Sequence, residues 1–165
     1  MVLVLILLLA VIYVGYELYK QYEVAKAVEI VDFSLEIAGI RLERREVKIS
    51  QSVDVRLRIN LYNNARHNLD VYITSVRLLV NGICIGSSEQ PVRLYVPAGG
   101  ESVVEVPIRL REEGSKLLLA KLWEYVLLGK KAMVVMEVRI EVPIKLAGRE
   151  MFRLPFSFTL AKPLP

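Results

Sequence analysis

The spacing of apolar and polar positions changes twice along the chain. Residues 1–16 (MVLVLILLLAVIYVGY) contain no charged side chain. In residues 17–29 a charged side chain recurs at every third position, which is typical of a helix whose neighbouring charges can pair along one face. From about residue 30 the period becomes two, which is typical of β-strands. The pattern predicts an apolar N-terminal helix with a short stalk (residues 1–29) and a single β domain (residues 30–165).

The first segment has the composition of a membrane anchor. As a helix, its sixteen residues extend about 24 Å, slightly less than the ~30 Å hydrocarbon core of a bilayer. Tyrosines at intervals of three follow, and such rings suit the headgroup zone. We expect these residues to form the membrane-facing surface of the anchor: Val2, Leu5, Leu8, Ile12, Tyr13 and Tyr16.

Several signals bear on how this anchor is used. The first residues contain no Lys or Arg and few small residues, which favours a retained anchor over a cleaved secretory signal. The acidic and basic residues that follow the anchor balance each other, so they specify its orientation in the membrane poorly. We expect a single-pass protein of the cell membrane, with the domain outside the cytoplasm because no intracellular chemistry is evident.

Alternation defines the strands of the domain. Five apolar residues at odd positions from Val53 to Leu61 alternate with polar ones, and residues 104–110 and 136–146 behave similarly. Residues 69–80 are expected to form a further strand. Asn81-Gly82 is a two-residue hairpin signal, and turns are also expected at 63–68, 97–100 and 147–148. Pro107 predicts a sheet edge or a bulge. About seven antiparallel strands predict a mainly β fold, an immunoglobulin-like or fibronectin-III-like sandwich.

One helix is expected inside the domain. Residues 115–128 follow Gly114 and end at Gly129, with an apolar stripe that includes Leu118 and Leu122. We expect Trp123 and Tyr125 of this helix to pack against the sheet, since an exposed Trp123 would indicate a partner surface.

Composition adds limits on function. The 165 residues are 54% hydrophobic and 24% charged, with a net charge of +4, and the basic residues are interspersed with Glu. This distribution argues against a nucleic-acid partner. The single cysteine, Cys84, excludes an internal disulfide and is expected to be buried and inert.

No catalytic or metal-binding pattern emerges from the candidate residues. His67 stands near Asp70, but neither Ser75 nor Ser87 has the surroundings of a catalytic nucleophile. A single His without Cys partners does not give zinc-ligand spacing. We therefore expect no enzyme activity, no cofactor, no metal and no small-molecule substrate.

A basic cluster is the main candidate for surface contact. It consists of Arg41, Arg44, Arg45 and Lys48. These side chains would touch anionic lipid headgroups if the domain sat low on a membrane. The alternative is a solvated strand edge whose charges discourage pairing between edges, and Glu43 and Glu46 dilute the cluster.

The order of the motifs resembles a known family. The matching segments are residues 57–64 (LRINLYNN), 79–86 (LVNGICIG), 96–100 (VPAGG) with 104–108 (VEVPI), and 154–158 (LPFSF). Residues 30–163 thereby resemble the late embryogenesis abundant type 2 family, also called the water stress and hypersensitive response (WHy) domain. One departure is Asn63-Asn64, where the family usually has Asn-Pro.

This resemblance implies a β-sandwich with one helix and a role in tolerance of desiccation or heat, without enzyme activity. We therefore expect a membrane-anchored archaeal member that protects membrane or client proteins by weak surface contact. Two structural alternatives remain. A pilin-like filament subunit would use the same architecture, but no basic-glycine processing site precedes Val2. An accessory subunit of a membrane complex would pack the helix against others, but the helix has no pair of small residues four apart.

Overall fold

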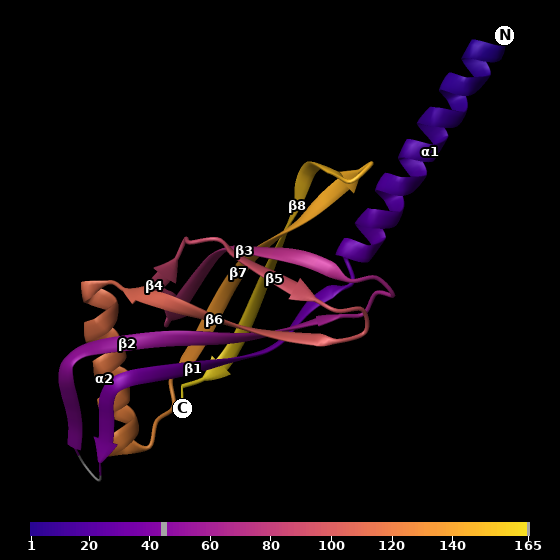
Figure 1. Cartoon of the computed structure of the whole chain (residues 1–165). Coiled ribbons are helices and arrows are strands. Elements are labelled where there is room, and N and C mark those ends of the chain that lie inside the picture. Colours follow the sequence, from indigo (N-terminus) through magenta and orange to yellow (C-terminus); the bar gives the residue numbers. More distant parts are fainter. Residues whose placement is uncertain (44–45, 165) are drawn as a thin grey trace.

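The computed structural model describes the backbone of residues 1–43 and 46–164, and the side chains of these residues outside 39–53. Its elements are α1 (Val2–Ala25), β1 (Val28–Glu43), β2 (Glu46–Asn63), β3 (Leu69–Val80), β4 (Ile83–Ser88), β5 (Val92–Val96), β6 (Glu101–Leu110), α2 (Glu112–Leu128), β7 (Met133–Leu146) and β8 (Arg149–Pro163). Figure 1 shows α1 standing out from one end of the β domain and α2 at the opposite end.

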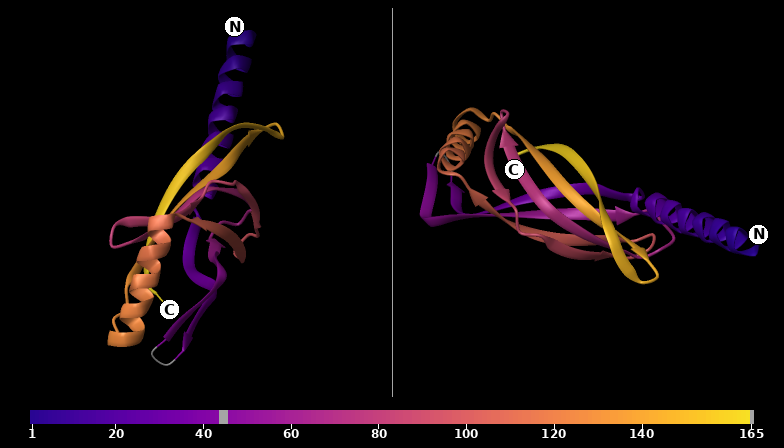
Figure 2. Two further views of the ribbon diagram at one scale, coloured as in Figure 1. Left: turned by 90° about the vertical axis from the view of Figure 1, so that its left-hand side faces the viewer. Right: turned by 90° about the horizontal axis from the view of Figure 1, so that it is seen from above.

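The described strands form one antiparallel sheet in the order β1-β2-β6-β4-β3-β7-β8, with β5 paired to β3 beside β4. The two halves of the sheet join through a short β4–β6 pairing at Gly86 and Ser87. The sheet curls so that its terminal strands approach each other (Figure 2). Lys162 Nζ of β8 donates to Asp32 Oδ1 and to the Phe33 carbonyl oxygen of β1, each at 3.1 Å. A core is thereby enclosed between the two halves.

The core contains the apolar residues that alternation placed on one face of each strand. Leu57, Ile59 and Leu61 of β2 are fully buried, as are Met136 and Ile140 of β7. Leu118 and Leu122 of α2 cover the end of this core. The predicted mainly β domain with one helix, preceded by an apolar helix, is confirmed. The immunoglobulin-like strand arrangement stays a prediction.

The predicted two-residue turns are present. Asn81 and Gly82 have φ of 52° and 76°, and Ala147 and Gly148 have φ of 50° and 76°. Positive φ at both central residues is the requirement of the hairpin turn that matches strand twist. Pro107 lies in β6 opposite Arg56, where β4 does not cover the other side of the strand, because β4 pairs only at Arg109 and Leu110. Pro107 therefore has a paired strand on one side, although β6 lies between β2 and β4 in the sheet and is not an edge strand.

Some element boundaries differ from the sequence prediction. The helical charge pattern was expected to run to about residue 29, but α1 ends at Ala25 and β1 begins at Val28. Val28 and Ile30 are buried and pair with Asn63 and Leu61 of β2. Burial in the sheet thus outweighs the helical spacing of the charges.

The helix of the domain also begins earlier than expected. α2 starts at Glu112, three residues before the predicted start, and Gly114 lies in its first turn. A Cβ atom at Gly114 would come within 2.1 Å of the Ile85 carbonyl oxygen. Gly114 therefore permits the first turn to approach β4, and Gly129 ends the helix at φ 67° as predicted.

Two predictions about single side chains need correction. Cys84 is half-buried rather than buried, and its Sγ lies 3.5 Å from the Gly86 carbonyl oxygen. Trp123 does not pack fully against the sheet: 39% of it is exposed. The cause is its place on α2, since Leu122 on the adjacent position takes the inward face.

Candidate functional site at the base of the N-terminal helix

The last turns of α1 are hydrogen-bonded to the β domain. The side-chain amide of Gln21 donates to the carbonyl oxygen of Lys145 in β7 and accepts from the N–H of Lys145 at 2.6 Å. One turn later, Ala25 is only 1% exposed and belongs to the core. The Asn64 N–H donates to the Ala27 carbonyl oxygen at 3.0 Å. The helix is therefore held by two separate parts of the domain.

A buried asparagine organises the loops beside this junction. Asn63, the last residue of β2, has no exposed surface. Its amide nitrogen donates to the carbonyl oxygens of His67 at 2.8 Å and Val96 at 3.3 Å, and its Oδ1 accepts from the Ala65 N–H at 2.9 Å. The side chain thereby acts as an Asx turn that satisfies its own polar atoms. It fixes the loop after β2 to the end of β5.

The neighbouring loop, which joins β5 to β6, is attached in the same way. Asn68 Oδ1 accepts from the Ala98 N–H at 2.9 Å. The Gly99 N–H donates to the Ala65 carbonyl oxygen at 3.1 Å, and Gly99 has a φ of 60° that favours glycine. Both loops are thus held against each other at the end of the domain from which α1 emerges.

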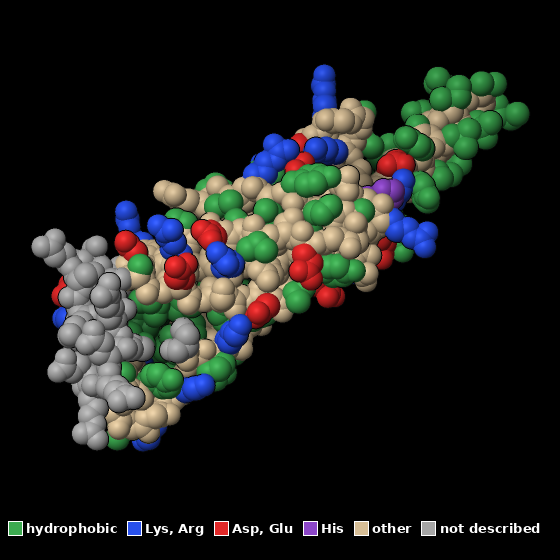
Figure 3. Space-filling model, turned by 60° about the horizontal axis from the view of Figure 1, so that its bottom comes forward, with side chains coloured by type: hydrophobic (Ala, Val, Ile, Leu, Met, Phe, Trp, Pro, Cys, Tyr) green, Lys and Arg blue, Asp and Glu red, His purple; other side chains and the backbone are tan. Residues whose placement is uncertain are grey.

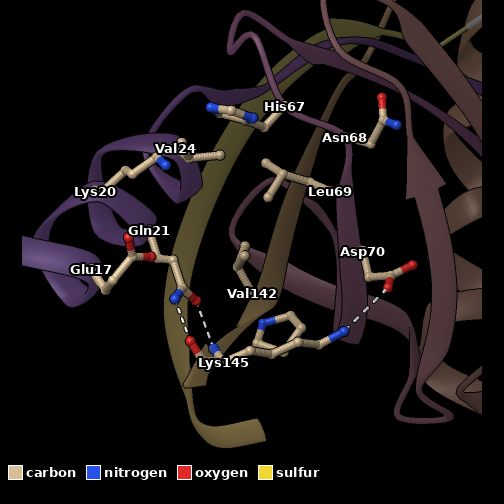
Figure 4. A pocket seen from close by; sticks show the side chains of 11 residues that line it. Glu17, Lys20, Gln21, Val24, His67, Asn68, Leu69, Asp70, Val142 and Lys145 are labelled. Carbon is tan, nitrogen blue, oxygen red and sulfur yellow. Dashed lines mark hydrogen bonds and ion pairs between the residues drawn. The ribbon is translucent and has the colours of Figure 1, made fainter. Parts of the chain in front are cut away.

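A cleft of about 290 Å³ lies between α1 and this end of the domain. Its lining residues come from α1 (Glu17, Lys20, Gln21, Val24), from the segment after Asn63 (His67, Asn68, Leu69, Asp70) and from β7 (Val142, Pro143, Lys145). Figure 4 shows Leu69 and Val142 in the middle of the cleft, with His67 on one side and the Gln21–Lys145 pair on the other. The cleft therefore has an apolar floor and a polar rim.

Opposite charges are balanced along that rim. The Asp70 carboxylate accepts from Arg93 Nη2 at 3.0 Å and lies 4.0 Å from Lys145 Nζ. The hydrogen bond to Asp70 raises the pKa of the Arg93 guanidinium above its ordinary value. Such a rim can hold ionic or hydrogen-bonding groups by direct contact.

The structure does not bring His67, Asp70 and either Ser75 or Ser87 together in a catalytic arrangement. The His67 side chain is exposed, and Asp70 is engaged by Arg93. Ser87 lines a different hollow on the surface, and Ser75 lies in β3 opposite Arg139. In the parts of the chain that the structure describes, no group of three His, Cys, Asp or Glu residues is placed to hold a metal ion.

The predicted anchor residues all lie on the exposed surface of α1. They are Val2, Leu5, Leu8, Ile12, Tyr13 and Tyr16. Figure 3 shows apolar side chains around the outer part of this helix, whereas charged side chains are scattered over the β domain. By length and composition α1 is able to cross a membrane, and a signal sequence would have the same properties.

The predicted headgroup cluster is only partly placed. Arg44 and Arg45 lie outside the described residues, as do the side chains of Arg41 and Lys48. The backbone register pairs Arg41 with Lys48 near the opposite end of β1 from α1. The contact of this cluster with headgroups stays a prediction.

The comparison with family models decides the classification. The model described as late embryogenesis abundant protein (LEA_2) matches residues 58–159, which is more than half of the chain. The chain belongs to the late embryogenesis abundant family. The matched region of this late embryogenesis abundant protein includes Asn63 and runs into β8, whereas α1 precedes it. The family expected from the motifs is thus confirmed despite the missing proline at Asn64.

Solved structures also resemble this late embryogenesis abundant protein. A protein from Arabidopsis thaliana is 17% identical, with a TM-score of 0.45 over 84% of this chain and 81% of that one. A protein from Archaeoglobus fulgidus is 8% identical, with a TM-score of 0.38 over 83% of this chain and 98% of that one. A comparison with curated proteins gives no match.

Two features at this end of the molecule were not predicted from the sequence. The first is the contact of Gln21, because a polar side chain on a helix gives no sign of the backbone that it will bond. The second is the exposed apolar pair beside the predicted turn at 147–148, where the β8 residues Met151 and Phe152 are 59% and 47% exposed. The sequence contains a signal for this apolar pair, because Met151-Phe152 stands next to a hairpin turn, where polar residues are expected.

Proposed function

We propose that this late embryogenesis abundant protein is a membrane-tethered, non-enzymatic stress-tolerance protein. In this proposal the β domain protects membrane or neighbouring proteins from heat or drying by weak surface contacts. Membership of the family supports the stress role and the lack of enzyme activity. The observation that carries the tether is an apolar helix whose residues 1–13 are exposed on all sides and whose last turns are hydrogen-bonded to a family domain.

The exposure of α1 is the physical reason for the tether. Its uncharged residues 1–16 extend about 24 Å of a bilayer core of about 30 Å, and the tyrosines at the end of this segment suit the headgroup zone. A helix that is apolar around its whole circumference needs an apolar environment on every side. The β domain contacts only its last turns, through Gln21 and Ala25. A bilayer supplies the environment that the rest of the helix requires.

The surface of the domain supports weak rather than specific contact. Cross-strand ion pairs join Arg58 to Glu105 at 2.7 Å and Arg77 to Glu137 at 3.3 Å. Exposed pairs of this kind contribute little energy and keep both charges hydrated. A tether raises the effective concentration of such a surface near the membrane, so that weak contacts can suffice there.

Fractionation of the cells that make the protein tests the tether. Sheared filaments, alkali-washed membranes and the soluble fraction are separated, and the intact mass of the chain is measured in each. The proposal expects the full-length chain in washed membranes. A soluble chain that lacks α1 would identify a signal sequence instead, and recovery in sheared filaments would identify a pilin-like subunit. Stable crosslinks to one membrane complex would identify an accessory subunit.

A separate assay tests protection. The full chain is placed in lipid nanodiscs and heated or dried with an aggregation-prone enzyme, and light scattering is followed. Nanodiscs with an unrelated single-pass domain are the control for lipid and crowding. We expect slower aggregation at modest molar excess over the enzyme. Equal scattering with both kinds of nanodisc would refute protection and leave the tether unaffected.

A further inference from the structure

The β7–β8 hairpin projects past the base of α1, toward the N-terminal part of that helix (Figures 1 and 2). We define the hairpin tip as residues 146–152. It follows Lys145, the residue that Gln21 holds, and turns at Ala147 and Gly148. The tip is therefore fixed beside α1 at a level set by Gln21.

The lengths of the two elements bring the tip to the end of the uncharged helix segment. Tyr16 precedes Gln21 by five residues, about 7.5 Å along a helix. Leu146, the last residue of β7, and Ala147 of the turn extend the chain beyond Lys145 by about 7 Å at ~3.3 Å per residue. Because the hairpin points along α1, its turn reaches the level of Tyr16 and Glu17, where a spanning helix would leave the hydrocarbon core. Phe152 pairs with Ile144, next to Lys145, and therefore lies near the level of Gln21, in the headgroup layer outside that exit.

The side chains of the tip have the character of interfacial residues. Met151 and Phe152 are 59% and 47% exposed, and Arg149 beside the turn is exposed too. Along most of β8 exposed residues alternate with half-buried ones, but residues 149–153 are all exposed. Apolar side chains next to Arg match an anionic headgroup layer, where rings and methyl groups enter the interface and the guanidinium stays at phosphates.

The base of the hairpin is held rigidly. Within β8, Arg153 Nε donates to Glu150 Oε1 at 2.6 Å, and the Arg153 guanidinium lies 4.0 Å from the centre of the Tyr72 ring of β3. The hairpin is thus contacted by two neighbouring elements, α1 and β3. Its apolar residues Met151 and Phe152 lie beside the Gln21–Lys145 contact, just outside the level of the helix exit.

We propose that the hairpin tip is a second membrane contact, which inserts Met151 and Phe152 into the headgroup region of an anionic bilayer beside α1. The proposal rests on the membrane tether proposed above. With two contacts, α1 and the tip, the domain is held at one tilt and height rather than swinging about the helix. The predicted cluster of Arg41 and Lys48 is not needed for this contact.

Single-tryptophan forms of the full chain provide the test. Trp123 is the only tryptophan and lies on α2, at the end of the domain opposite α1. The wild-type chain is therefore the distal control. In a Trp123→Phe background, Phe152→Trp reports the tip and Leu8→Trp reports the span. Each chain is reconstituted in phosphatidylcholine–phosphatidylglycerol vesicles, with or without bromines on the upper part of the acyl chains. Leu8→Trp is also measured with deeper bromines.

The outcomes separate this inference from the tether itself. Because interfacial rings lie near shallow bromines, we expect those bromines to roughly halve the emission of Phe152→Trp and to leave Trp123 unchanged. Quenching of Leu8→Trp without quenching of Phe152→Trp overturns the hairpin contact and retains the tether. Absence of quenching at both positions overturns both proposals. If Phe152→Trp fails to fold by circular dichroism, Met151→Trp takes its place with the same expectation.

Discussion

Gln21 of α1 satisfies both backbone polar groups of Lys145 in β7, in the way that a neighbouring strand would. The β3 strand pairs with β7 only as far as Tyr72 and Glu141, so β7 continues beyond its partner. The Gln21 side chain donates to the Lys145 carbonyl oxygen and accepts from its N–H there. A single side chain thus closes a sheet edge and sets the position of the apolar helix on the domain.

Replacing Gln21 with Ala should loosen this junction. Loss of two partly solvated hydrogen bonds should lower the free energy of unfolding by about 1 kcal/mol. The Lys145 amide should exchange its hydrogen roughly fivefold faster, because the opening it needs becomes easier by a similar free energy. Hydrogen exchange and urea unfolding of the full chain in detergent micelles measure both. Lys20→Ala, one position away on α1, is the control and should change neither.

Asn63→Ala should be one of the more damaging single substitutions. It removes three hydrogen bonds and leaves the buried Val96 carbonyl without its side-chain donor, with an expected cost of about 2–4 kcal/mol in the free energy of unfolding. Urea unfolding checks this. Asn64→Ala is the matched control, because Asn64 is exposed and contributes its backbone N–H; it should cost less than about 0.5 kcal/mol. Equal losses in the two variants would contradict the role assigned to Asn63.

The sequence predicted those features that depend on neighbours along the chain. Alternation identified the buried face of β2, including Leu57 and Ile59, and Asn81-Gly82 identified a hairpin, because both signals reflect backbone geometry within a few residues. Asn63 is part of the motif that resembles the family, but its hydrogen bonds to His67 and Val96 are evident only in the structure.

Features that depend on distant segments could not be predicted. The meeting of β1 and β8 requires the curl of the whole sheet, and nothing near Asp32 in the sequence indicates Lys162 as its partner. The start of α2 was misplaced for the same reason. A glycine in a helical pattern usually indicates a boundary, whereas Gly114 serves the approach of the helix to Ile85.

Gly114→Ala should therefore destabilise the domain although alanine favours helices. The new Cβ would lie 2.1 Å from the Ile85 carbonyl oxygen and would push the first turn of α2 away from β4. We expect a loss of about 1–3 kcal/mol, the usual cost of overpacking. Thermal unfolding measures the loss. Gly15→Ala is the control, since its Cβ would meet no atom within 4 Å, and it should be neutral or stabilising. A stabilised Gly114→Ala chain would show that α2 does not need this close approach.

The contact between β1 and β8 predicts a response to acid. The hydrogen bond from Lys162 lowers the pKa of Asp32 below its ordinary value of 3.8. In the unfolded chain Asp32 lacks this partner and binds its proton more readily. The stabilisation is therefore complete above about pH 5 and is lost as the pH falls through the lowered pKa of the folded state.

Lys162→Met should remove that contribution. The free energy of unfolding should then depend less on pH below about pH 4, where Asp32 takes up its proton. The measurement is urea unfolding at a series of pH values. Because both side chains are well exposed, the effect should be small and should weaken further near 1 M salt. Lys116→Met, which removes an even more exposed pair with Glu112 inside α2, should leave the acid profile unchanged. An acid profile of Lys162→Met that matches the wild type would mean that the two edge strands are joined by apolar packing and by backbone contacts, without help from this ion pair.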